Sequence, residues 1–185
     1  MPTEFVHPNG ERLTFTKTTA ETGGEYLEIE ATYHPQSPQP PAHYHPRQEE
    51  RFEVLSGTFR LAIDGEEQTY KTGERFTIPA KTPHALQNIG DEEGRLRWQV
   101  RPALKTQDFF ATLWGLATEG QSGESGTGGL LQLAVILNAY RDEFRTSDPP
   151  YILQRLAFSL LAAVGRLRGY RARYDRFSGE AAAEA

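Results

Sequence analysis

The first hundred residues alternate between apolar and polar side chains with a period of two. In one such segment Leu96, Trp98 and Val100 lie on one side, and polar residues stand between them. Successive side chains of a β-strand point to opposite faces of the sheet, so each segment of this kind predicts a strand with one buried face. Turn signals separate the segments, among them the Asp-Gly pair at 64–65, which favours a tight hairpin. Many short strands with frequent turns predict an all-β barrel or sandwich over residues 1–104.

The spacing of apolar residues becomes helical after residue 105. A stripe from Leu130 to Phe144 and an apolar segment over 151–168 predict two helices, and a shorter helix is expected over 107–117. Glycine and serine dominate the stretch between the helix expected over 107–117 and the one that starts at Leu130, which is typical of a flexible link. The expected organisation is a β-barrel over residues 1–104 and an α-helical C-terminal extension over 105–185, with a linker at 119–129 and a frayed tail at 178–185.

Charge and composition exclude several classes of protein. The chain has 25 acidic and 20 basic residues, a net charge of −5, so it lacks the basic footprint of a nucleic-acid-binding protein. It has no cysteine, which excludes disulfides, thiolate metal sites and a cysteine nucleophile. The N-terminus does not resemble a secretory signal and no long apolar run predicts a membrane span, so we expect a cytoplasmic protein.

Three histidines and one glutamate form a candidate metal-binding set. His43 and His45 stand at positions i and i+2 of a predicted strand, so both imidazoles lie on the same face. Alternation places Glu50 on the apolar side of its strand and Glu49 on the solvent side, and a buried carboxylate is costly unless it is paired or metal-bound. His84 begins another strand, again on an inward face. Such a set suits first-row transition metals, although each histidine taken alone is also typical of an ordinary hydrogen-bonded residue.

The spacing of these residues resembles the two motifs of the cupin family. The first motif is His-x-His, three or four residues, Glu, six residues and Gly, and it matches His43, His45, Glu50 and Gly57. The second motif runs from a glycine through a proline to a histidine and an asparagine, and it matches Gly73, Pro79, His84 and Asn88. Two further positions differ from the motifs, because Ser37 and Lys81 stand where the family has glycine.

The resemblance implies a fold, a cofactor and a set of ligands. It implies a cupin-like antiparallel barrel, also described as a double-stranded β-helix or jelly roll. The barrel would hold a divalent transition metal, which in the family is Mn, Fe, Ni, Cu or Zn. The metal ligands that it implies are His43, His45, Glu50 and His84.

Alternation also predicts which side chains line the barrel around that site. An apolar cavity with one polar focus suits a small organic molecule, and the alternative is that these side chains simply fill the barrel. Arg47 lies beside the ligands and could hold a carboxylate, or it could be a solvated loop residue. The candidate wall residues are Phe52, Phe59, Phe76, Leu86 and Trp98.

Three classes of function remain open at this point. A metal-dependent enzyme, with oxygenase, isomerase or lyase chemistry, and a non-catalytic module that binds or senses a small molecule are equally compatible with the ligand set. No catalytic residue beyond the ligands is indicated. The third class uses the C-terminal helices, where arginines crowd behind an apolar segment, to bind a membrane surface or a partner. Packing of this helix on the barrel or on a second subunit is the favoured interpretation, and apolar helix faces and sheet edges predict a homodimer.

Overall fold

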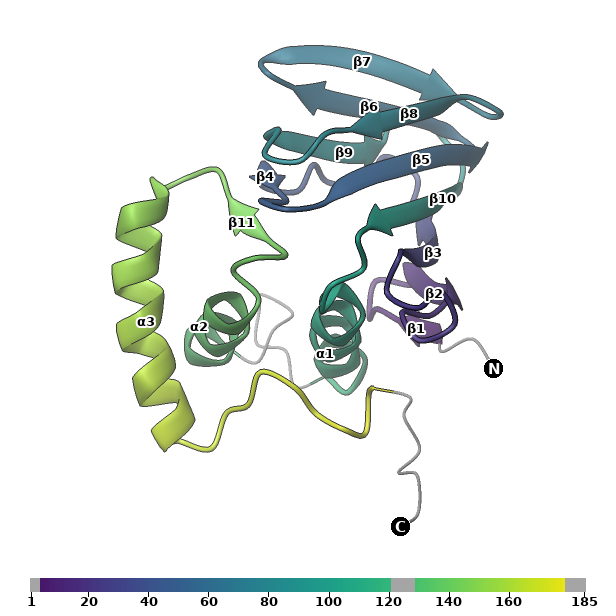
Figure 1. The fold of residues 1–185 in the computed structure, drawn as a ribbon. Coiled ribbons are helices and arrows are strands. Elements are labelled where there is room, and N and C mark those ends of the chain that lie inside the picture. The colour runs from purple at the N-terminus through teal and green to yellow at the C-terminus, as the bar shows by residue number, and fades with distance from the viewer. Residues whose placement is uncertain (1–3, 121–128, 179–185) are drawn as a thin grey trace.

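The computed structural model describes residues 4–120 and 129–178, which form two antiparallel sheets and three helices. The first sheet has the order β1 (Glu4–Val6), β2 (Arg12–Lys17), β3 (Leu27–Tyr33), β10 (Gly94–Arg101), β5 (Glu49–Ser56) and β8 (Arg75–Ile78). The second sheet has the order β11 (Arg145–Thr146), β4 (His43–Tyr44), β9 (His84–Asn88), β6 (Thr58–Ile63) and β7 (Glu66–Lys71). The sheets face each other as a jelly-roll barrel, which confirms the predicted fold class (Figure 1).

The alternation along the strands matches their burial. On β10, Leu96, Trp98 and Val100 are buried, and the residues between them are exposed or half-buried. The predicted hairpin joins β6 to β7, where Asp64 has a φ of 50° and Gly65 a φ of 83°. Positive φ at both central residues is what a two-residue hairpin of this twist requires, and glycine adopts it without steric cost.

In Figure 1, α1 and α2 lie below the barrel, with α1 in contact with β1, and α3 lies at the left and packs on α2. Their bounds are α1 (Thr106–Thr118), α2 (Leu130–Ala139) and α3 (Tyr151–Leu167). α2 and α3 pack closely because Gly165 has no side chain: a Cβ there would lie 2.9 Å from the carbonyl oxygen of Leu131. Gln48 ties the barrel to the segment before α1 and to its first residue, since its buried amide nitrogen donates to the carbonyl oxygens of Pro102 and Ala103 and to the hydroxyl oxygen of Thr106.

The prediction that a helix runs from Leu130 to Phe144 and buries an apolar stripe was wrong for α2. The helix ends at Ala139, and Leu130 is 61 % exposed. The buried face instead includes Gln132, whose amide nitrogen donates to the carbonyl oxygen of Arg171 and whose amide oxygen accepts from the Tyr174 hydroxyl. With both ends of the amide satisfied, a polar residue can be buried at little cost. Most of the predicted linker, residues 121–128, and all but the first residue of the predicted tail lie outside the described residues.

The chain returns from α2 to the barrel through residues 140–147, which we call the strap. Within it, β11 pairs with β4 and sets Arg145 opposite Tyr44 and Thr146 opposite His43. The backbone N–H of Ser147 donates to the carbonyl oxygen of Ala42 at 2.8 Å. The extension therefore adds an edge strand beside the strand that carries His43.

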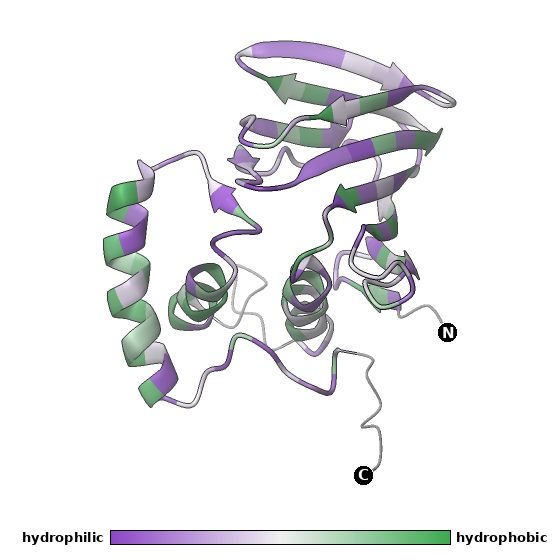
Figure 2. Cartoon of the chain, in the orientation of Figure 1, coloured by the Kyte–Doolittle hydropathy of each residue, from purple (hydrophilic) through white to green (hydrophobic). Residues whose placement is uncertain are grey.

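α3 has two apolar faces. One packs on α2, and the other carries exposed residues that recur along the helix, among them Leu156 and Leu160, as Figure 2 illustrates by hydropathy. None of the helices in the described part of the chain has the length and apolar character needed to cross a bilayer.

Candidate metal centre

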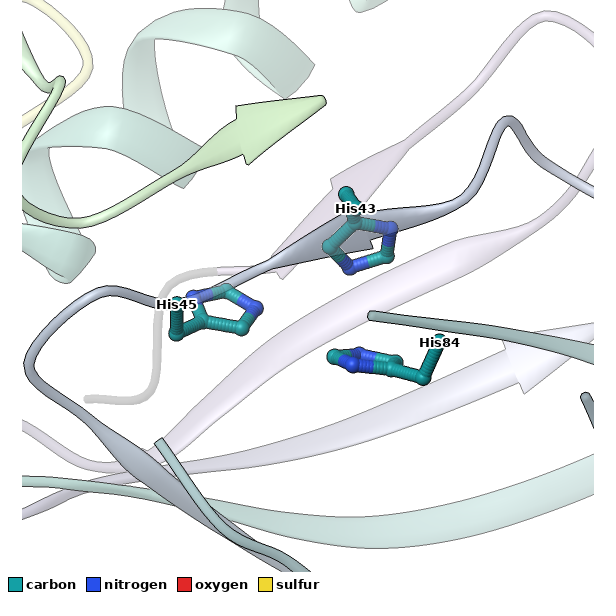
Figure 3. Close-up of side chains that lie close together, drawn as sticks. All are labelled: His43, His45 and His84. Carbon is teal, nitrogen blue, oxygen red and sulfur yellow. The ribbon is translucent and has the colours of Figure 1, made fainter. Parts of the chain in front are cut away.

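Two neighbouring strands, β4 and β9, bring the histidines together. His43 lies on β4 directly opposite His84 on β9, and His45 follows β4 on the same face as His43. One ring nitrogen of each lies within 4.8 Å of one ring nitrogen of the other two. Figure 3 shows the three rings converging on a common point. The i, i+2 spacing of the first pair produces this geometry, as the strand period predicts.

Each of the three imidazoles has its Nδ1 next to a backbone carbonyl oxygen. Nδ1 of His45 lies 2.6 Å from the carbonyl oxygen of Glu143, Nδ1 of His84 lies 3.0 Å from that of Thr82, and Nδ1 of His43 lies 3.3 Å from that of Pro41. A carbonyl oxygen can only accept, so each Nδ1 carries the proton when the ring is neutral. Each Nε2 then keeps a free lone pair, which is the state in which imidazole binds a metal.

Glu50 closes the group from β5. Its side chain is almost completely buried, with Oε1 3.2 Å from Nε2 of His45 and Oε2 3.0 Å from Nε2 of His84. Among the described residues, neither Nε2 of His45 nor Oε2 of Glu50 has a hydrogen-bond partner. Lone-pair nitrogens and a carboxylate this close repel each other unless a cation lies among them, and the unsatisfied atoms fit a divalent metal ion.

Burial and the charge of Glu50 shift the pKa values of the group. Burial lowers the pKa of His43 to about 3, with further lowering from His84 and His45, so this ring stays neutral. Burial would also lower the pKa of His45, but the Glu50 carboxylate overrides it and raises that pKa. Burial alone would raise the pKa of Glu50, and the two histidines beside it lower it. The carboxylate is therefore ionised and calls for positive charge next to it.

The strap supplies contacts that the sequence reasoning missed. The ring of Phe144 stacks on His43 with centroids 4.7 Å apart and planes at 24°, and the carbonyl oxygen of Glu143 orients His45. Phe144 also stacks on Phe109 of α1, with centroids 5.4 Å apart. In the sequence, Phe144 fits the end of an apolar helical stripe, so nothing local marks it as a neighbour of the histidines.

The predicted wall residues are all buried, and three of them form one stack. Phe52 stacks on Phe76 with centroids 4.9 Å apart and on Trp98 with centroids 5.7 Å apart. The indole N–H of Trp98 is buried without a hydrogen-bond partner in the described part of the chain. Phe59 and Leu86 are buried on the second sheet.

Arg47 lies outside the histidine group, whereas Tyr33 lies on the inward side of β3. Arg47 has a 64 % exposed side chain, and its Nη1 lies 4.0 Å from Asp142, so it is not brought into the histidine group. Tyr33 was not singled out, although it continues the inward alternation of β3. Burial, with smaller contributions from Glu11 and Glu50, raises its pKa above the ordinary value of 10.0, so its hydroxyl remains a proton donor.

The two positions that differ from the cupin motifs are accommodated by local hydrogen bonds. Ser37 is buried, and its hydroxyl oxygen accepts from the backbone N–H of Asn88 at 3.0 Å. Lys81 takes the left-handed conformation expected of glycine, with a φ of 68°, and its N–H donates to the carbonyl oxygen of His45 at 2.8 Å. The turn before β9 is thus kept without its glycine.

Comparisons with known proteins identify the domain. Residues 29–100 match the family model described as Cupin domain. Protein SchB of Streptomyces halstedii is 34% identical over 67 residues, which are 36% of this chain and 49% of that protein. Polyketide synthase CurC of Streptomyces cyaneus is 35% identical over 60 residues, 32% of this chain and 39% of that protein.

A solved structure, an RmlC-like cupin from Shewanella frigidimarina, is similar at a TM-score of 0.49 and 17% identity, over 57% of this chain and 88% of that one. The match to the cupin domain thus covers most of the barrel, and a helical C-terminal extension follows it. It spans about half the length, or less, of the two curated relatives.

Proposed function

We propose that the protein holds one divalent transition-metal ion in its barrel and uses it to bind a small organic molecule. The ligands are Nε2 of His43, His45 and His84, with the carboxylate of Glu50. One observation carries the proposal: three imidazoles, each with a backbone carbonyl at Nδ1, have ring nitrogens within 4.8 Å of one another, and Nε2 of His45 and of His84 lie 3.2 and 3.0 Å from the buried carboxylate of Glu50. Mn, Fe, Ni, Cu and Zn all suit this ligand set.

The surroundings of the group support an organic ligand. Stacked aromatic side chains of the barrel wall offer an apolar surface, and the indole N–H of Trp98 offers an unused donor. Tyr33 adds a hydroxyl that stays protonated. A bound metal would supply Lewis acidity and, if redox-active, a site for dioxygen. The relative named polyketide synthase CurC is consistent with an organic ligand of this kind.

The chain's own residues hold and orient the ion rather than supply a strong base. The carbonyls of Pro41, Thr82 and Glu143 fix the rings, and the ionised Glu50 provides the negative charge. The Tyr33 hydroxyl is neutral and can donate a hydrogen bond, but it is not a base. This favours either chemistry carried by the metal, of the oxygenase, isomerase or lyase type, or ligand binding without turnover as the second candidate.

Elemental analysis of the full chain, purified without added metal, tests the proposal. We expect about one transition-metal ion per chain. The double variant His43→Ala/His45→Ala should lose it, while His7→Ala, which removes a half-buried histidine outside the group, should retain it. Far-ultraviolet circular dichroism checks that the barrel persists. Metal retained by the double variant, or refusal by the wild type of every divalent ion offered, would overturn the assignment.

Mass spectrometry of the metal-loaded protein, incubated with a library of small organic acids and phenols, separates the two candidate roles. A compound retained with unchanged mass supports binding alone. A compound released with altered mass supports an enzyme.

A further inference from the structure

A pocket lies between α2, the strap and α3, outside the barrel. It is an open hollow: its volume of about 340 Å³ includes the solvent in front of it, and its enclosed part is about 20 Å³. Three arginines line it, Arg141, Arg145 and Arg155, and none of its lining residues is acidic. This is unusual on a chain whose net charge is −5. Positive charge concentrated in one hollow of an acidic protein points to an anionic ligand.

Of the three arginines, Arg145 has an acidic neighbour among the described residues and the other two do not. Arg145 lies 3.6 Å from Asp142, and its guanidinium stacks on the ring of Tyr151 at 3.7 Å. Arg141 and Arg155 have no acidic partner in the part of the chain that the structure describes, although both line the pocket. Two guanidinium groups without partners can each donate paired hydrogen bonds to a carboxylate.

Apolar side chains form another part of the lining, next to the polar residues Asn138, Thr146 and Gln154. Phe144, Phe158 and Leu137 contribute apolar surface beside the arginines. Such a mixture suits a carboxylate attached to a flat apolar body, because the ring covers the aromatic side chains while the charge meets the guanidinium groups. Inorganic anions would leave the apolar part of the lining unused.

We propose that this pocket is a binding site for a small aromatic carboxylate. It is separate from the metal ligands but shares Phe144 with them, since the same ring stacks on His43. An occupant of the pocket would therefore contact the residue that supports the metal centre. The proposal does not depend on the barrel holding a metal.

Calorimetric titration of the full chain with benzoate tests the site, with benzamide as the uncharged isostere. Benzoate should bind saturably, and benzamide at least about tenfold more weakly, because the charge-assisted hydrogen bonds are lost. The variant Arg141→Ala/Arg155→Ala should lower benzoate affinity at least about tenfold. Arg166 is an exposed arginine on α3, as Arg155 is, but lies outside the pocket, so Arg166→Ala should leave the benzoate affinity unchanged. Arg155→Glu should abolish binding and serves if the double variant is unstable.

Benzoate could also bind a metal in the barrel, so each titration is repeated on chelator-treated protein and on His43→Ala/His45→Ala. Binding that persists in both, and depends on the arginines, supports the pocket. Binding that disappears with the metal, or that is equal in the arginine variants and the wild type, would overturn it. Absence of benzoate binding to the wild type would do the same.

Discussion

Replacing Phe144 with alanine separates the role of the strap at the metal centre from its role in packing. The substitution removes a ring that stacks on both His43 and Phe109. Truncating a buried phenylalanine costs about 3–5 kcal/mol, and because Phe144 is only half-buried we expect about 2 kcal/mol. Loss of a residue that orients a metal ligand typically weakens metal affinity by about 10–100-fold. We expect about tenfold here, since the carbonyl that holds His43 at Nδ1 remains.

The two effects are measured together by urea unfolding with and without metal. At a metal concentration far above Kd, a tenfold rise in Kd removes about 1.4 kcal/mol of the metal-dependent stabilisation. Phe177→Ala is the matched control, because that ring is buried against Gly115 of α1, away from the histidines. It should lower the free energy of unfolding while leaving the metal-dependent increment intact. An equal increment in both variants would refute the idea that Phe144 supports the metal centre.

Three further predictions concern the scaffold. Gly165→Ala gains about 1 kcal/mol of helix propensity but places a Cβ 2.9 Å from a backbone oxygen. Overpacking of about 1–3 kcal/mol should exceed this gain, so the melting temperature should fall. A rise would contradict the close approach of α2 and α3. Lys81→Gly relieves left-handed backbone at a cost in chain entropy and should raise stability by about 0.5–1 kcal/mol in denaturant titrations, and a loss would show that the lysine side chain matters there. The pKa of Glu53 is lowered from 4.5, chiefly by a hydrogen bond from Arg75, so its stabilisation is present above pH 4.5 and is lost as the pH falls through the lower folded value. The melting temperature of Glu53→Gln should therefore lie below that of the wild type at pH 7 and converge with it in acid; a difference that is independent of pH would argue against the ion pair.

The barrel could be predicted from the sequence because strand alternation is a local property. The same parity that separates Leu96 from its neighbours also separates buried Glu50 from partly exposed Glu49. Once the faces were assigned, the convergence of the histidines followed from two short motifs. Their role as metal ligands is still a prediction, which the elemental analysis addresses.

The contribution of the extension could not be predicted, because it depends on pairing between distant segments. β11 is two residues long and has no pattern of its own, so only its partner strand defines it. Phe144 carries the hydrophobicity of a helix face, and the sequence cannot indicate that α2 ends before it. Likewise, the buried amide of Gln132 is satisfied by residues about forty positions away, beyond the reach of periodicity.

The hydrogen bond from His45 to Glu143 spans 98 residues of chain. At the usual pace of translation, about 5–20 residues per second, the carbonyl that orients this imidazole is made roughly 5 to 20 seconds after the imidazole itself. A nascent barrel thus leaves the ribosome with its histidine strand still an open sheet edge. If an ion binds during that interval, it meets His45 before the carbonyl that orients this ring has been made.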